Sequence, residues 1–309
     1  MPVSDALVVG EQWISEHYFT TDATKQSFQA KVIERRKQWD EQKASGTVRT
    51  RFTAARGDLL GTFTTLEAHD LRLGEFYEQI EHVLGFDRIG LTREQLGPVT
   101  RINSIGLTNA APLAIVHATP VESVEDLLNK EASTLVEPFV VDDTTTYRSV
   151  ARAVSSLFTS PDHPQFVLVL AGGLALIAER ERWHEGRYLL VDLQLVCERN
   201  DDKKGGEVDR ALTILEATSL APDAEGDIWW TSVLEASVKH TVGVSEDLRE
   251  GVRLSIEIIA NDVVKRRRGL GLDALPKDQA QPLARQALRF LYRILFLLYA
   301  EASPELGVL

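Results

Sequence analysis

The stretch of residues 166–178 constrains the fold of this chain more than any other. Two short apolar runs, residues 166–170 and 174–178, flank the pair Gly172 and Gly173. Glycine adopts positive φ angles at no steric cost, and a tight turn between antiparallel strands requires such angles. The sequence therefore predicts a β-hairpin. A phosphate-binding glycine loop is disfavoured, because a strand rather than a helix follows the glycines.

Three further runs have the composition of strands. Residues 98–105 and 112–118 are apolar or β-branched, and the polar and small residues 108–111 separate them. A third run follows the hairpin at residues 188–197. Together with the hairpin, these runs predict one mixed sheet.

The rest of the chain has the periodicity of helices. Apolar residues recur at steps of three and four, as on one buried helical face. The predicted helices cover residues 23–43, 47–60, 71–84 and 144–158 before the last strand, and residues 209–220, 228–239, 245–267 and 283–302 after it. The polar loop 200–206 has no apolar anchor and predicts a boundary between domains at 1–199 and 207–309.

Composition limits the classes of function. The chain has 309 residues, 44% of them hydrophobic, and a net charge of −12, so it is expected to fold but not to offer a generally basic surface to nucleic acid. The single cysteine, Cys197, excludes an internal disulfide and is expected to be a buried structural thiol. The longest apolar segment, residues 290–300, contains Arg293 and is too short to cross a bilayer. A cytoplasmic protein without membrane contact is expected.

Basic residues are dense only near the end of one predicted helix. Lys265, Arg266, Arg267 and Arg268 precede Gly269, where cations complement the negative end of a helix dipole and glycine ends the helix. The same run is a candidate for DNA contact. Lys239 and His240 are two further candidates near a predicted helix end.

The order helix, strand, strand, helix, strand between residues 71 and 170 is that of a restriction-endonuclease-like core. Active nucleases of this kind hold Mg²⁺ with an acid on one central strand and with an acid and a lysine, two residues apart, on the next. The second pair of positions falls on His117 and Thr119, which cannot do this work, and residues 98–105 contain no acid. We therefore expect no nuclease activity and no metal site. If an active site exists, the candidates are Glu78, Glu81, Glu122 and Asp126.

Other catalytic patterns are weaker. His117, His163, His184 and His240 lack the paired spacing of metal ligands, and His117 on an apolar strand is expected to be a core histidine with a satisfied hydrogen bond. The chain has no Asn-Pro-Pro-Tyr type tetrapeptide and no glycine-rich S-adenosylmethionine loop after a strand.

Three segments carry a family resemblance. Residues 235–253, which contain Ser-Val-Lys-His and Gly-Val-Ser-Glu-Asp-Leu, residues 288–301, and residues 166–189 resemble the regions preceding the catalytic domain of type IIG restriction-modification enzymes and related BREX-like phage-defence adenine methyltransferases. The resemblance implies the amino-terminal part of a larger enzyme that binds S-adenosylmethionine and methylates N6 of adenine in double-stranded DNA. Methyl transfer would then lie beyond Leu309, and this part would need no cofactor.

The expected fold is accordingly α+β, with a helical amino terminus, a small mixed sheet resembling a restriction-endonuclease-like core, and an all-helical connector. The expected role is a nuclease-inactive scaffold that positions DNA or a partner for a DNA adenine methyltransferase. One alternative is an active Mg²⁺-dependent endonuclease domain. The other is a protein-interaction module that binds partner proteins of a defence complex.

Overall fold

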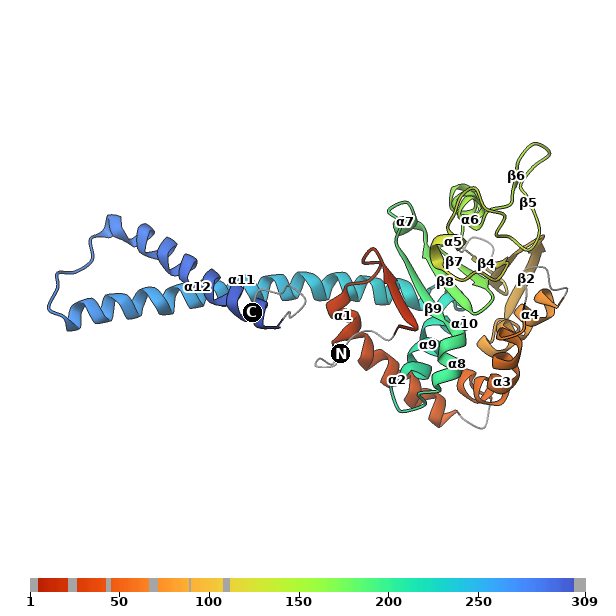
Figure 1. Cartoon of the computed structure of the whole chain (residues 1–309), viewed down its shortest axis with the longest axis horizontal. Helices are drawn as coiled ribbons and strands as arrows, with labels where there is room; N and C mark the ends of the chain where they lie inside the picture. The colour runs from red at the N-terminus through yellow and green to blue at the C-terminus, as the bar shows by residue number, and fades with distance from the viewer. Residues whose placement is uncertain are drawn as a thin grey trace. The chain divides into compact units, whose positions relative to one another are not determined.

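The computed structural model describes residues 5–21, 27–42, 46–66, 72–88, 90–107 and 112–302. The chain divides into two compact units, Met1–Val238 and Lys239–Leu309. The first is α+β and the second is helical (Figure 1). The long helix α11 (Trp229–Gly269) begins in the first unit and continues in the second.

A seven-stranded mixed sheet forms the centre of the first unit, in the order β1-β9-β8-β7-β4-β3-β2. Its strands are β1 (Leu7–Gly10), β2 (Leu91–Leu96), β3 (Val99–Ser104), β4 (Leu113–Ala118), β7 (Phe166–Ala171), β8 (Leu174–Glu179) and β9 (Tyr188–Asp192). All neighbours pair antiparallel except β4 and β7, which run parallel with Ile115 opposite Leu168. Two short strands, β5 (Phe139–Val140) and β6 (Thr146–Tyr147), pair separately in the connection between β4 and β7.

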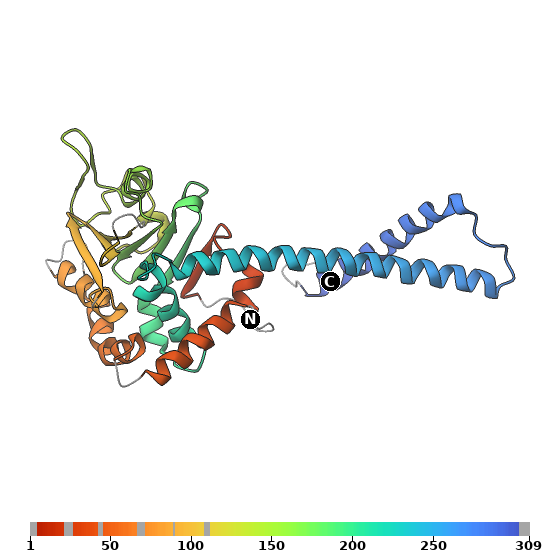
Figure 2. The ribbon, with the colours of Figure 1, turned by 180° about the vertical axis from the view of Figure 1, so that it is seen from behind.

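Helices cover both faces of the sheet (Figures 1 and 2). Those of the first unit are α1 (Glu16–Thr20), α2 (Phe28–Glu41), α3 (Val48–Phe63), α4 (Leu73–Leu84), α5 (Val124–Leu127), α6 (Val150–Thr159), α7 (Arg180–Trp183), α8 (Leu193–Arg199), α9 (Glu207–Leu215), α10 (Ala217–Leu220) and the start of α11. Side chains alternate along β4, so that Leu113 and Ile115 join the larger core and Ala114 and Val116 join the smaller one. The strands are therefore buried on both faces.

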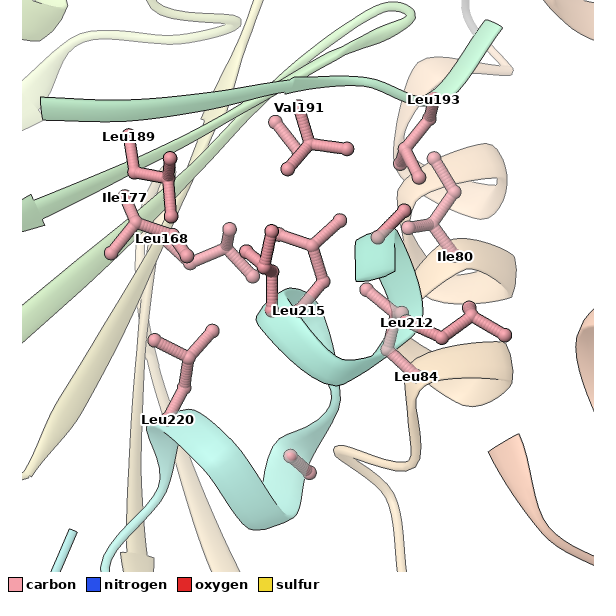
Figure 3. Close-up of a cluster of buried hydrophobic side chains, with 14 of the residues drawn as sticks. Ile80, Leu84, Leu168, Ile177, Leu189, Val191, Leu193, Leu212, Leu215 and Leu220 are labelled. Carbon is pink, nitrogen blue, oxygen red and sulfur yellow. The ribbon is translucent and has the colours of Figure 1, made fainter. Parts of the chain in front are cut away.

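The larger core lies between the sheet and the helices α2 to α4 and α8 to α10. Figure 3 shows strand side chains of this core facing Leu212 and Leu215 of α9, Leu220 of α10, and Ile80 and Leu84 of α4. The smaller core lies on the other face, under α5 and α6, and α6 contributes Val150, Val154 and Leu157 to it. These two cores determine which side chains are available at each face of the sheet.

The predicted hairpin is confirmed, with β7 and β8 joined at Gly172, whose φ is +60°. The predicted strands 98–105 and 112–118 correspond to β3 and β4, while the residues 108–111 predicted to separate them lie outside the described ones. The predicted strand 188–197 is wrong in its second half, which forms α8. The side chain of Asp192 accepts a hydrogen bond from the Leu195 backbone N–H at 2.9 Å and so caps that helix.

Four of the described strands were not predicted: β1, β2 and the short pair β5 and β6. The predicted helix 144–158 is wrong in its first part, because β6 (Thr146–Tyr147) lies there and α6 begins only at Val150. β1 pairs with β9, nearly two hundred residues later, so the amino terminus is not purely helical. β2 is an edge strand whose charged and polar side chains are mostly exposed, a composition that protects a sheet edge but lacks apolar alternation. The sheet is therefore larger than the small one expected.

The compact units divide at Lys239, later than the expected boundary at residues 200–206. The carboxylate of Asp209 in α9 is fully buried and binds Arg36 of α2 at 2.9 Å and Arg49 of α3 at 3.3 Å. Trp230 at the start of α11 donates its indole N–H to the Ile214 carbonyl at 2.9 Å. Residues 207–238 therefore pack with the sheet and its helices, because buried polar groups of α9 find their partners there.

The second unit contains the rest of α11, the short η2 (Lys277–Gln279) and α12 (Ala280–Ala302). The predicted helices 228–239 and 245–267 are one continuous helix, which passes through Gly243 at a propensity cost of about 1 kcal/mol. The predicted helix 283–302 is confirmed as α12. Within the described part of the chain, no helix is both long and apolar enough to cross a membrane.

Candidate functional site

A buried carboxylate on α4 is the starting point of the candidate site. The helix is amphipathic and buries Phe76, Tyr77 and Ile80 in the larger core. It ends at Gly85, which adopts the left-handed conformation with φ of +86° and closes the last turn. Glu81 lies on the same buried face, with a side chain only 1% exposed. A buried carboxylate requires partners.

Glu81 has two such partners from different strands. Its Oε1 lies 2.6 Å from Nε2 of His117 on β4, and its Oε2 accepts a hydrogen bond from the guanidinium of Arg93 on β2. The Arg93 side chain is 32% exposed, so the ion pair extends from the core toward solvent. His117 is thus a core histidine with a satisfied hydrogen bond, as predicted.

Tyr77 lies beside His117, with the two ring centroids 4.9 Å apart, and its hydroxyl binds the strand ends. Its hydroxyl donates to the Ala118 carbonyl at the end of β4 and accepts from the Gly172 N–H, just after β7, at 2.7 Å. Burial raises the pKa of the Tyr77 hydroxyl, opposed in part by the Gly172 hydrogen bond. A side chain at Gly172 would bring its Cβ within 2.9 Å of Cβ of Pro120. The hydroxyl therefore joins the carboxyl ends of the two parallel strands.

The donor set does not fit a divalent metal ion. Mg²⁺ prefers several oxygen ligands, whereas Glu81 is the only carboxylate in this network and its charge is already compensated by Arg93. No group of three or more potential His, Cys, Asp or Glu ligands occurs among the described residues. Thr119, at the position where a nuclease would carry its lysine, donates its hydroxyl to the Thr134 carbonyl at 3.3 Å.

The other three acidic candidates lie apart from this network. Glu78 is on the exposed face of α4, and Glu122 is exposed before α5. Asp126, also exposed, accepts the Ser123 hydroxyl at 2.7 Å in the first turn of α5. No hydrogen bond or ion pair within the described ranges joins any of the three to Glu81. The four candidates do not assemble into one site.

The candidate DNA contacts all lie on α11. Lys239 is exposed and His240 is half-buried. Arg266 pairs with Asp262 at 2.7 Å, and Arg267 donates to the Asp273 carbonyl at 2.8 Å beyond the helix end, while Lys265 and Arg268 are exposed. The basic run therefore has the structural role expected of cations at a helix terminus.

Sequence reasoning missed Arg93, the second partner of Glu81, and Tyr77, whose ring centroid lies 4.9 Å from that of His117. Arg93 lies on β2, and the turn that could have indicated this strand is Gly97-Pro98, where Gly97 has a φ of +60° between Leu96 and Val99. Tyr77 precedes Glu81 by one helical turn, a spacing that places both on one face. No signal in the sequence connects either residue to β4.

The comparisons add no relative. No protein-family model, no curated protein and no solved structure matches the chain. The fold and the site define an α+β unit with a mixed sheet, in which a Glu81-His117-Arg93 network lies beside Tyr77 near the ends of the parallel strands.

Proposed function

We propose that the first unit is a restriction-endonuclease-like domain that does not cleave DNA. Its central elements follow the order α4, antiparallel β2, β3 and β4, crossover helix α6, and β7 parallel to β4. This is the order of helix, strands, helix and strand that the sequence predicted for such a core, with one more strand. The topology supports the likeness.

The observation that carries the loss of cleavage is the engagement of Glu81. A nuclease carboxylate must hold a metal ion, but both oxygens of Glu81 are already bound, one by His117 and one by Arg93. Removing Arg93 from a buried carboxylate would cost several kcal/mol, because the charge would be left uncompensated. The ion pair between Arg93 and Glu81 therefore has a structural role.

The role of this domain, in our proposal, is a scaffold that positions DNA or a partner protein within an adenine-specific DNA methyltransferase of a restriction or phage-defence system. The resemblance of residues 235–253 and 288–301 to such enzymes supports this role. In that enzyme S-adenosylmethionine would bind outside this chain, and double-stranded DNA would be the substrate.

Plasmid cleavage tests the first part of the proposal. The chain is incubated with supercoiled DNA and Mg²⁺ or Mn²⁺, beside Glu81→Gln and a double variant Glu122→Ala, Asp126→Ala. We expect no nicking by any of the three proteins. Cleavage that disappears in either variant would establish the alternative, an active Mg²⁺-dependent endonuclease.

Binding to duplex DNA tests the scaffold role. Fluorescence anisotropy with a labelled duplex should show affinity that falls as salt rises, because cations that neutralise phosphates release counterions. Lys265→Ala with Arg268→Ala should reduce both the affinity and the salt dependence, while Lys203→Ala with Lys204→Ala, at two exposed lysines of the first unit, serves as the control. Absence of salt-sensitive binding would favour the protein-interaction module.

One observation favours that second candidate function. Helix α12 exposes a run of large apolar side chains in the described part of the second unit: Phe290, Tyr292, Ile294, Leu295, Phe296, Leu297, Leu298 and Tyr299. Contiguous exposed apolar surface commonly marks a site of protein contact. A protein-binding role for the second unit is compatible with a scaffold role for the first.

A further inference from the structure

A cavity of about 460 Å³ lies on the α6 side of the first unit. Its lining comes from one face of α6, from α7 with the turn after it, and from the loop that follows α5. The volume is within the range of small-molecule sites. Glu81 packs against the opposite face of the sheet, so the cavity is separate from the network at the strand ends.

Aromatic side chains form one wall of this cavity. Trp183 is half-buried, and its indole N–H donates to the Ser155 hydroxyl at 2.9 Å. Ser155 in turn donates to the Ala151 carbonyl at 2.8 Å, so its hydroxyl accepts a hydrogen bond from α7 and donates one within α6. The ring of Phe158 lies 6.4 Å from that of Trp183. The hydrogen bond to Ser155 thus orients the indole ring, which lies beside the apolar side chain of Phe158.

The arginines next to this cavity are paired with carboxylates, unlike the cations that line it. Three neighbouring acids are already paired, Glu131 with Arg152, Glu179 with Arg182, and Glu185 with Arg187, and none of these three arginines lines the cavity.

Lys130 and Arg180 do line the cavity, and neither makes an ion pair with a carboxylate in the described ranges. Among the described residues, the Arg180 guanidinium hydrogen-bonds to the ring of His163, with Nη1 2.8 Å from Nε2. His184, also in the lining, is 3.8 Å from Glu185. Positive charge is therefore left uncompensated beside an aromatic wall, in a chain whose net charge is −12.

We propose that this cavity binds a nucleotide. The base stacks on the indole of Trp183, a contact available to every base because each has a π face. The phosphate is bound by Lys130 and Arg180, since charged donors form the strongest hydrogen bonds to phosphate oxygens. A free mononucleotide and a nucleotide of a single strand share this chemistry. The site is independent of the proposed nuclease-like function.

Calorimetric titration of the full chain with AMP, adenosine and inorganic phosphate tests the site. AMP should bind more tightly than either of the other two probes. Lys130→Ala with Arg180→Ala should weaken AMP binding about ten-fold or more, because each charged hydrogen bond contributes measurably, and should leave adenosine binding unchanged. Arg152→Ala, a neighbouring arginine outside the cavity, is the matched control and should bind AMP as the unmodified chain does.

Substitutions at the indole separate stacking from charge. Trp183→Ala should weaken AMP binding about ten-fold, the usual scale of one base stacked on an aromatic ring, and Trp183→Phe should retain most of the affinity. Equal affinity for phosphate and AMP, or no AMP binding at millimolar concentration by a folded chain, would overturn the proposal. A single-stranded oligonucleotide that binds more tightly than AMP would assign the site to nucleic acid, and equal affinities would assign it to the free nucleotide.

Discussion

Apolar side chains have opposite environments in the two units. In the first, both faces of the sheet are covered, and residues such as Leu168, Leu212 and Leu215 are fully buried. In the second, the buried apolar residues of the described part are Ala287 and Ala300, while Leu248 and Ile258 of α11 are more than 60% exposed. Large apolar side chains are thus buried in the first unit and mostly exposed in the described part of the second.

The difference shows where the stability of each unit originates. Burial of apolar surface is the main favourable term in folding, and helices in water depend on packing more than on propensity. The first unit has that packing. The second has helices whose large apolar side chains are mostly exposed among the described residues, so these helices should open at lower free energy than the sheet.

The largest expected effect concerns the buried charge of α9. Asp209→Ala should lower the free energy of unfolding of the first unit by about 3–5 kcal/mol, because Arg36 and Arg49 lose a fully buried partner. Tryptophan fluorescence in urea measures this unit alone, since all five tryptophans precede Lys239. Asp262→Ala, which removes an exposed ion pair with Arg266, should change this free energy of unfolding very little. If Asp262→Ala lowered the free energy of unfolding as much as Asp209→Ala does, the ion pairs of the two units would not differ in strength.

A pair of leucines compares apolar burial directly. Leu215→Ala in α9 should cost about 2–5 kcal/mol, because the site is fully buried and a cavity would remain. Leu248→Ala in α11 should cost less than about 0.5 kcal/mol, since this side chain is 62% exposed. Urea unfolding followed by circular dichroism detects both units. A large loss in the second variant would show that Leu248 is covered in solution.

Self-association should depend on the apolar side chains of α12. Phe290→Glu with Leu298→Glu places charge on two residues that are each more than half exposed, and it should shift sedimentation toward the monomer at high protein concentration. Gln281→Glu with Gln286→Glu adds the same charge at exposed polar positions of this helix and should leave the sedimentation unchanged. A chain that is monomeric at all concentrations before substitution would contradict this expectation.

The smallest effect concerns Cys197. Burial raises the pKa of its thiol to about 12, and Arg56 opposes this shift in part. The thiol should react slowly with a disulfide reagent until the chain is unfolded, as its burial in the core requires.

The same shift has a consequence for stability at high pH. The folded pKa of Cys197 lies above the unfolded one, so the stability that this group contributes is complete below pH 9 and falls as pH rises toward 12. Cys197→Ala should therefore reduce the loss of unfolding free energy between pH 9 and pH 11. An identical loss in both proteins would show that other groups cause it.

Several elements could be predicted because their signals are local. The glycine pair at Gly172 and Gly173 sets a turn, and the runs that became β3 and β4 are short and apolar between polar segments. The second half of residues 188–197 could not be predicted, because an apolar run suits a strand and a buried helix equally, and the Asp192 cap decided between them.

The candidate site was predicted only in part. That His117 is a core histidine followed from its place on an apolar strand. Among the four acids proposed, Glu81 alone proved buried and bound to histidine. Helical spacing places it on the face of Tyr77 and Leu84, unlike the exposed Glu78, but no local pattern identifies its partners. Which of these two acids meets His117 depends on which face of α4 packs against β4.

By itself, the sequence determined the strands β3 and β4, the hairpin, the helical carboxyl-terminal third and the end of α11 at Gly269, because each follows from side chains that interact within a few residues. Only the tertiary structure decided that β1 joins β9, that Arg93 and His117 converge on Glu81, that Asp209 ties α9 to the first unit, and that Lys130, Arg180 and Trp183 meet at one cavity. These contacts join residues far apart in the chain, and their partners are chosen by packing and charge compensation, which no local pattern encodes.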